Sequence, residues 1–264
     1  MSTFREQLAD STPCSGTEVE AILENRSIPS VLQDLNLILN SEEITEILHA
    51  LIFLRDAALY SHRLHEPFRK HLLASPIPET LRNLLQSPSR AVRRNSIYTI
   101  GKLTFREHAS FLSDAFPFYL DHYPLEMPGL LSELAWLTGE LNWEFVQQVA
   151  SSENRCVRWS LCSALHSLGE REDRQVRSLH VLTSLTCDPY PFISAEARWL
   201  CERIKVKLGP KLPKPEWRRE VKRISSLEPK VTFKRAVSQF LASNTHPDYS
   251  MRDLNQFLSE LEFL

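Results

Sequence analysis

Glycine is scarce in this sequence of 264 residues, with only six copies beside 16 prolines. Six glycines supply few of the positive-φ positions that β-hairpins and phosphate-binding turns require. The patterns GxGxxG, GxxxxGK and GxSxG are all absent from the sequence. Leucine occurs 40 times, against 24 occurrences of isoleucine and valine together, and this excess favours helices over sheets. The composition therefore indicates an all-α protein without a glycine-rich nucleotide loop.

The sequence also has little that would direct it into or across a membrane. Its first residues lack a basic stretch followed by an apolar core, so we expect no secretory signal. The longest strongly apolar run, Ile47 to Leu54, is interrupted by His49 and is much shorter than the ~20 residues that span a bilayer. The five cysteines are scattered and form no CxxC pair, which is typical of reduced thiols in the cytosol. These features predict a cytoplasmic location and no membrane partner.

Charge is distributed unevenly along the chain. Residues 1–48 contain nine acidic and two basic residues, whereas residues 202–235 contain twelve basic and four acidic residues. We define the basic cluster as Arg203, Lys211, Lys214, Arg218, Arg219, Lys222 and Arg223. Such a cluster predicts contact with an acidic partner or a nucleic acid. It is equally typical of a solvated helix face whose charges match the acidic N-terminal part of another copy.

Helical periodicity dominates the pattern of apolar residues. Fifteen segments, from Thr17–Asn25 to Met251–Phe263, repeat apolar or small residues at spacings of three and four. The residues Val92, Ser96, Ile100 and Leu103 form one such stripe. Prolines fall mainly between these segments, where they do not interrupt a helix. No strand-like alternation is present, so we expect an antiparallel array of helices joined by short loops.

One element of the sequence recurs. The stretches Ser87–Ile97, Ser152–Leu161 and Asp188–Ala197 each begin with a polar turn, continue with an apolar residue that opens a helix, and then place small residues three to five positions later. A looser fourth copy begins at Leu130. The helix-opening residues, which lie 38, 27 and 36 positions apart, are Val92, Leu130, Val157 and Ile193. This spacing predicts stacked helical pairs.

The turn-Val-Arg element, with Val92-Arg93 and Val157-Arg158, and the endings Ile100-Gly101 and Leu168-Gly169 resemble the HEAT-repeat family. The resemblance covers roughly residues 41–208 and implies a right-handed α-α superhelix of five to six helical pairs. We expect residues 1–40 to form capping helices and residues 209–264 to form an atypical C-terminal helical extension, since both ends fit the repeat poorly. The proline-rich stretch after Leu208 predicts a stiff connector at that boundary.

The repeat register also predicts which side chains face outward. If Val92, Ser96 and Ile100 face the core, helical spacing turns Arg94, Tyr98 and Lys102 away from it. The same register equates Tyr98 with Trp136 and Trp199, and Arg94 with Trp159. In HEAT-like folds this side of the second helix lines the concave surface, so the resemblance implies an aromatic row there. We expect a partner-binding set of Arg94, Tyr98, Trp136, Trp159 and Trp199, although rings at helical spacing also fit core packing.

Several functional hypotheses follow from this register. The first is a non-enzymatic interaction scaffold or adaptor that binds a protein partner. The second is nucleic-acid binding through Arg158, Arg203 and the basic cluster. Within the second, Trp136, Glu140 and Trp199 are similar to the Trp and carboxylate residues of HEAT-like DNA alkylation-repair glycosylases, with Glu140 in place of the usual Asp. A third possibility is an assembly chaperone or chromophore lyase, as some HEAT-like proteins are.

Metal and cofactor chemistry have little support in the sequence. His62 and His65 have the spacing of two ligands on one helical turn, with His71 further along, but no third ligand follows the same logic. A hydrophilic segment beside Pro67 explains these histidines equally well. We therefore expect no metal and no cofactor, and Glu140 is the one catalytic candidate.

Overall fold

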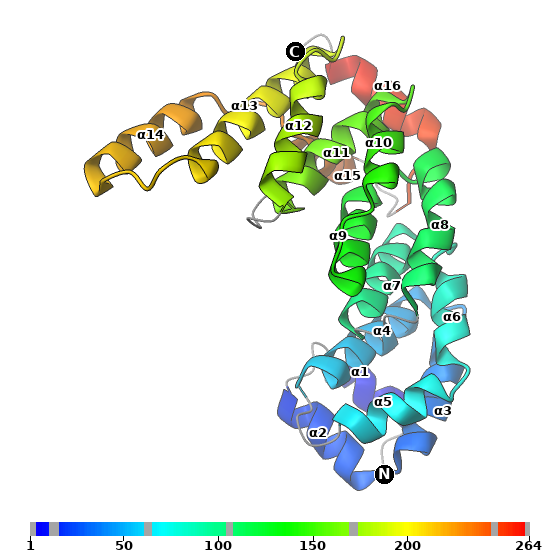
Figure 1. Cartoon of the computed structure of the whole chain (residues 1–264). Helices are drawn as coiled ribbons and strands as arrows, with labels where there is room; N and C mark the ends of the chain where they lie inside the picture. Colours follow the sequence, from blue (N-terminus) through cyan, green and yellow to red (C-terminus); the bar gives the residue numbers. More distant parts are fainter. Residues whose placement is uncertain are drawn as a thin grey trace. The chain divides into compact units, whose positions relative to one another are not determined.

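The computed structural model describes residues 4–10, 16–60, 65–103, 108–168, 174–243 and 248–261, and these residues form sixteen α-helices and no β-strand (Figure 1). The first eight helices are α1 Phe4–Asp10, α2 Gly16–Asn25, α3 Ile28–Leu39, α4 Ile44–Tyr60, α5 His65–Leu73, α6 Ile77–Leu84, α7 Arg90–Lys102 and α8 Ala109–His122. The other eight are α9 Met127–Thr138, α10 Trp143–Ala150, α11 Arg155–Leu168, α12 Gln175–Leu185, α13 Pro191–Leu208, α14 Lys214–Ser226, α15 Phe233–Ser243 and α16 Met251–Leu261.

The all-α prediction is confirmed, and each of the fifteen expected segments corresponds to a helix. The helix that the sequence did not reveal is α1, which has only seven residues. It contributes two buried apolar side chains, Phe4 and Leu8, and the Phe4 ring lies edge-on to Phe53 of α4 with 5.8 Å between centroids. Two apolar residues four positions apart are too few to establish a helical period, so packing on α4 is what identifies this helix.

The chain divides into two compact units. One contains residues up to Ala115 together with Trp136–Gly139, and the other contains Phe116–Ala135 together with Glu140–Leu264. The division therefore falls within α8 and α9. Residues on both sides of the expected boundary at Leu208 belong to the second unit. The three-part organisation into residues 1–40, 41–208 and 209–264 stays a prediction.

Helical pairs build each unit. In the first unit α3 packs on α4 and α6 packs on α7, while α4 and α7 lie against each other. The Thr99 hydroxyl of α7 donates a hydrogen bond to the Leu51 carbonyl oxygen of α4 at 3.2 Å. In the second unit α10 packs on α11, α12 packs on α13, and α11 lies against α13. Stacked pairs of this kind are the unit of a helical-repeat fold.

The repeat register is correct at the four helix openings. The residues Val92, Leu130, Val157 and Ile193 lie in the first turn of α7, α9, α11 and α13 and are fully buried. The residue after the valine has a structural role in two copies. Arg93 donates from Nη1 to the carbonyl oxygens of Ser87 and Pro88, and Arg158 donates in the same way to those of Ser152 and Glu153. Each arginine thereby satisfies the carbonyl groups of the turn that precedes its helix.

A third copy of this arginine turn lies in the C-terminal extension. Arg235 donates from Nη1 to the carbonyl oxygens of Pro229 and Lys230 at 3.1 and 3.2 Å, again six and five residues earlier. One local feature of the repeat therefore recurs in the C-terminal extension, which the sequence predicts to be atypical. Lys234 stands where the other copies have valine, and this substitution hides the similarity in the sequence.

Consecutive pairs of the second unit are also joined by an ion pair. Arg158 at the start of α11 reaches Asp188 in the turn before α13, with 2.6 Å between Nε and Oδ2. The side chains of Arg158 and Asp188 are 12% and 3% exposed, so the pair is largely shielded from water. Asp188 is the one clear turn aspartate of the repeats, and this contact explains its presence.

Candidate functional site

Trp159 belongs to the core, so its predicted role as an exposed partner contact is wrong. Its side chain is 1% exposed, and its indole Nε1 donates to Glu196 Oε2 at 2.6 Å. The Phe233 ring, at the start of α15, lies edge-on to it with 5.7 Å between centroids. Because α15 packs on α11, a segment 70 or more residues away in sequence covers the face that the repeat register turns outward.

Glu196 is the buried carboxyl that connects α11, α13 and α15. The same Oε2 atom accepts hydrogen bonds from Trp159 Nε1 at 2.6 Å and from the backbone N–H of Phe233 at 2.7 Å. Burial raises the pKa of Glu196 to about 7, and the two hydrogen bonds oppose that rise. Because it accepts a hydrogen bond from the first residue of α15, the buried Glu196 carboxyl anchors the N-terminus of that helix.

Trp199 is also mostly buried, with 7% of its surface exposed, so the expected exposed row does not extend through it. Its ring lies 6.0 Å from that of His166, and α14 packs beside α13 along this stretch. Its indole Nε1 is buried and has no hydrogen-bond acceptor among the described residues. Trp199 nevertheless lines one end of a groove between α13 and α14.

Three of the five predicted contact residues lie at the surface, all in the first unit. Arg94 is exposed, and its guanidinium carbon lies 5.6 Å from the centre of the half-buried Tyr98 ring. Trp136 is 55% exposed, with the Lys102 ammonium 5.3 Å from its ring centre. These are cation–π contacts at exposed positions. Partner binding by Arg94, Tyr98 and Trp136 stays a prediction.

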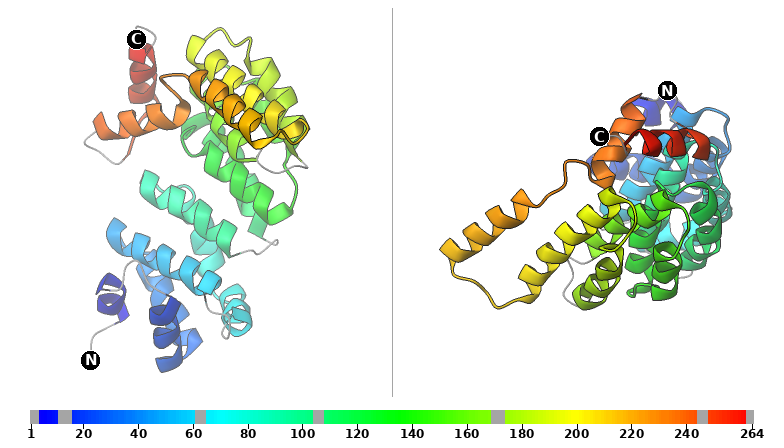
Figure 2. Two further views of the ribbon diagram at one scale, coloured as in Figure 1. Left: turned by 90° about the vertical axis from the view of Figure 1, so that its left-hand side faces the viewer. Right: turned by 90° about the horizontal axis from the view of Figure 1, so that it is seen from above.

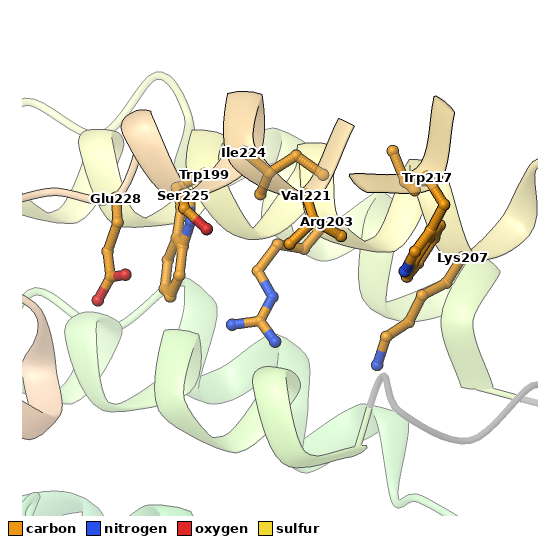
Figure 3. Close-up of a pocket in the computed structure, with 9 residues that line it drawn as sticks. Trp199, Arg203, Lys207, Trp217, Val221, Ile224, Ser225 and Glu228 are labelled. Carbon is orange, nitrogen blue, oxygen red and sulfur yellow. The ribbon is translucent and has the colours of Figure 1, made fainter. Parts of the chain in front are cut away.

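The second unit contains an open groove of about 230 Å³ between α13 and α14, which we call the α13–α14 groove (Figure 3). The hairpin of α13 and α14 that forms it projects from the other helices of this unit (Figure 2). Two tryptophans, Trp199 and Trp217, stand at different points along it. The full lining consists of Trp199, Arg203, Val206, Lys207, Trp217, Val221, Ile224, Ser225 and Glu228.

Apolar residues on α14 that the functional predictions overlooked form much of this groove. Trp217 and Val221 are 42% and 41% exposed, and Ile224 completes a stripe at spacings of four and three. The stripe is visible in the sequence, but the functional predictions for this segment used only its basic residues. An apolar stripe in an otherwise highly charged helix is the signal that identifies this surface.

The two long edges of the hairpin differ in charge. On one edge Arg223 of α14 contacts Glu202 of α13 at 2.9 Å and Glu220 at 2.6 Å. Lys205 contacts Glu202 at 2.9 Å on the same edge. Hydrogen bonds from Lys205 and Arg223 lower the pKa of Glu202. We call these four residues, Glu202, Lys205, Glu220 and Arg223, the ion-pair edge.

Helical spacing places a second set of cations on the opposite edge. Each residue of a helix is turned 100° from the one before it. When two antiparallel helices face each other, residues turned to the same side of the contact, counted from N to C in each helix, lie on the same edge of the pair. By this rule Arg203 and Lys207 of α13 lie on the side opposite Glu202, and Lys214 and Arg218 of α14 lie on the side opposite Glu220. We call Arg203, Lys214 and Arg218 the cationic edge. Figure 3 shows the Arg203 and Lys207 side chains extending to the same side as the Trp199 ring.

The predicted basic cluster is thus divided by the structure. Arg203 lines the groove, and Arg223 belongs to the ion-pair edge. Lys214 and Arg218 are exposed beside the groove. Arg219 and Lys222 are exposed on α14 further from the groove, and Lys211 is exposed in the connector between α13 and α14.

The residues of the glycosylase hypothesis do not all belong to the same unit. Glu140 is exposed and follows Gly139, whose φ of 75° ends α9. Trp136 belongs to the first unit, whereas Glu140 and Trp199 belong to the second. Arg158, a proposed phosphate contact, forms an ion pair with Asp188 and donates a hydrogen bond to the Ser152 carbonyl oxygen. Catalysis at Glu140 stays a prediction.

For the histidine pair, His62 lies outside the described residues, and His71 is exposed on α5. Within the described part of the chain, no group of three or more His, Cys, Asp or Glu residues is arranged to hold a metal ion. Among the described helices, none combines the length and apolar character needed to cross a membrane.

No protein-family model and no curated protein match this chain. Solved structures that are similar to it include an engineered protein from the Northeast Structural Genomics Consortium, with 16% identity and a TM-score of 0.44 over 76% of this chain and 89% of the other. A designed armadillo repeat protein in complex with the peptide (KR)4 has 12% identity and a TM-score of 0.44 over 76% and 90%. The assignment to the helical-repeat class rests on the stacked pairs themselves.

Proposed function

We propose that this protein is an interaction adaptor that binds a segment of another protein in the α13–α14 groove. The observation that carries the proposal is the exposed apolar stripe of α14, which faces a second tryptophan across an open groove. Large apolar side chains gathered in a concavity are typical of binding sites, and tryptophan is enriched among the residues that dominate binding energy.

The local architecture supports a peptide-like ligand. The sides of the groove are two antiparallel helices of one hairpin, and a third segment laid between them would bury Trp217 and Val221 together. Amphipathic helices bind in such grooves through residues spaced three and four apart. Full burial of a side chain of this size contributes about 1.5–3 kcal/mol. Because Trp217 and Val221 are 42% and 41% exposed, a bound segment gains part of that amount from each of them.

Nucleic-acid binding is less well supported by the same surface. The exposed cations of α14 favour it, but Arg223 is held between Glu220 and Glu202, and Glu216 is exposed on the same helix. Carboxylates among the cations reduce the attraction of a phosphate backbone, which depends on the number of cations that contact it. No described feature favours an assembly chaperone or a chromophore lyase.

Selection from an unbiased display library of 16-residue peptides tests the proposal on the full-length protein. We expect enriched peptides whose affinity falls at least tenfold in Trp217→Ala and in Val221→Ser. Leu37→Ala is the matched control, because Leu37 is an exposed apolar residue of the first unit and its truncation leaves the groove intact. Peptides that bind wild type and Trp217→Ala equally, or a failure to enrich any peptide, would overturn the proposal.

A further inference from the structure

The charge asymmetry of the α13–α14 hairpin specifies a ligand more narrowly than its apolar stripe does. On the ion-pair edge, each charged group has an opposite charge within 2.9 Å. These four charges are therefore largely compensated within the hairpin. The exposed Glu216, one turn before Glu220, adds only negative charge to this edge, so the edge has no attraction for an acidic ligand. Any attraction of the groove for an acidic ligand comes from its other side.

Arg203 provides the cation closest to the groove floor. Its guanidinium carbon lies 5.0 Å from the centre of the Trp199 ring, and no carboxylate of the described residues lies within ion-pair distance of it. A cation placed on an apolar surface interacts more strongly with an incoming carboxylate than a fully hydrated cation does, because the effective dielectric constant is lower there. Lys214 and Arg218 of α14, both exposed, continue this positive edge.

Glu228, the one carboxylate of the groove lining, does not cancel this edge. It lies beyond the end of α14, and Arg235 binds it with 2.9 Å between Nη2 and Oε1. The negative charge at that end of the groove is therefore compensated by a residue of α15. The groove presents an apolar floor, one compensated edge and one cationic edge.

The dimensions of the hairpin define the size of the ligand. The 13 residues of α14 extend about 20 Å, which corresponds to three to four turns of a partner helix. A helix of this length packs its apolar stripe against Trp217, Val221 and the Trp199 end of the groove. The residues beside that stripe then lie along the two edges of the hairpin.

The geometry points to an acidic amphipathic helix of three to four turns as the occupant of the groove, with Asp or Glu residues along the side of its apolar stripe that faces Arg203, Lys214 and Arg218. This inference rests on the proposed adaptor function and adds the chemical class and orientation of the bound segment. It favours a protein ligand over a nucleic acid because the apolar stripe of the ligand meets the apolar floor of the groove, which a phosphate backbone cannot use.

Adjacent arginines on α14 provide a matched pair of variants for the test. Arg218 lies on the cationic edge, whereas Arg219, one residue later, is turned about 100° further from the groove. Both are exposed, so Arg218→Glu and Arg219→Glu make the same charge change on the same helix. Circular dichroism and the thermal midpoint of each variant establish that both remain folded.

The probe is a library of 16-residue peptides with a fixed helical leucine stripe and with Glu, Lys or Gln allowed at the flanking positions. Selection on the full-length protein should enrich Glu on one flank only. Measured by fluorescence anisotropy, the affinity of a selected peptide should fall about tenfold in Arg218→Glu and in Arg203→Glu but less than twofold in Arg219→Glu. Replacing the flanking Glu residues of the peptide by Lys should restore binding to the Arg203→Glu, Arg218→Glu double variant.

The outcomes separate this inference from the adaptor function. Peptides that require Trp217 but show no acidic flank, with equal affinity for Arg218→Glu and Arg219→Glu, would overturn the charge assignment and leave the adaptor function standing. Absence of peptide binding would overturn both. Salt-dependent binding of duplex DNA or single-stranded RNA that is lost in Arg218→Glu, without peptide binding, would identify a nucleic-acid surface instead.

Discussion

The buried carboxyl of Glu196 predicts a specific pH dependence of stability. Its pKa is raised from 4.5 to about 7 by burial, so the folded protein holds this proton more tightly than the unfolded chain does. The contribution of Glu196 to stability is therefore greatest below pH 4.5, declines as pH rises through the interval up to about 7, and is constant above it. At 1.36 kcal/mol for each pH unit, the whole interval corresponds to about 3 kcal/mol.

Glu196→Gln isolates this effect. Both hydrogen bonds of Glu196 end on the same oxygen, Oε2, so the single carbonyl oxygen of glutamine can accept from Trp159 and from the Phe233 backbone. The glutamine does not titrate. We expect the free energy of unfolding of wild type to fall by about 2–3 kcal/mol relative to that of Glu196→Gln between pH 5 and pH 8.

Urea unfolding followed by tryptophan fluorescence at pH 5, 6, 7 and 8 measures this difference, and other titrating groups cancel between the two proteins. Glu202→Gln is the control, because the pKa of Glu202 is lowered rather than raised, so its removal has the opposite dependence on pH. Parallel pH profiles for wild type and Glu196→Gln would refute the reasoning, since they would mean that burial does not shift the ionisation of Glu196.

Three further predictions concern stability. Trp159→Ala should destabilise the protein by about 3–5 kcal/mol in chemical denaturation, because this ring is buried. Trp136→Ala should change stability by less than about 1 kcal/mol, because that ring is 55% exposed. Similar losses for the two variants would contradict the burial of Trp159. Arg158→Met should cost about 3–5 kcal/mol, because it leaves the Asp188 carboxylate buried without its cation, and the added change Asp188→Asn should recover part of that loss in a double-mutant cycle. Arg235→Ala should lower stability by about 0.5–1.5 kcal/mol, because water can replace the arginine at the two exposed turn carbonyl groups. An unchanged urea midpoint would show that this turn does not need its arginine.

Most of the helices and the repeat register were predictable from local sequence. Spacings of three and four identified Val92, Ser96, Ile100 and Leu103 as core residues, and all four are buried. Prolines and polar turns located the helix ends because they act within a few residues. The arginine turn at Arg235 was missed because its preceding residue is lysine rather than valine, although its hydrogen bonds repeat those of Arg93 and Arg158.

The candidate site was much less predictable. The register correctly turned Trp136 outward, yet the equivalent faces of α11 and α13 are covered, and Trp159 and Trp199 are buried. Conversely, Trp217 on α14 lies outside the residues that the repeat register covers, and its side chain is 42% exposed. A helical period states which residues share a face, but it does not state what packs on that face.

Local sequence is enough to establish that this protein is helical, where most helices begin and end, and which residues of each repeat share a face. Those properties depend on backbone preferences and on neighbours within a few turns. The tertiary structure decided which faces remain open, because α14 and α15 fold back beside α13 and α11 and cover tryptophans from distant parts of the chain. That non-local packing leaves the α13–α14 groove with one compensated and one cationic edge.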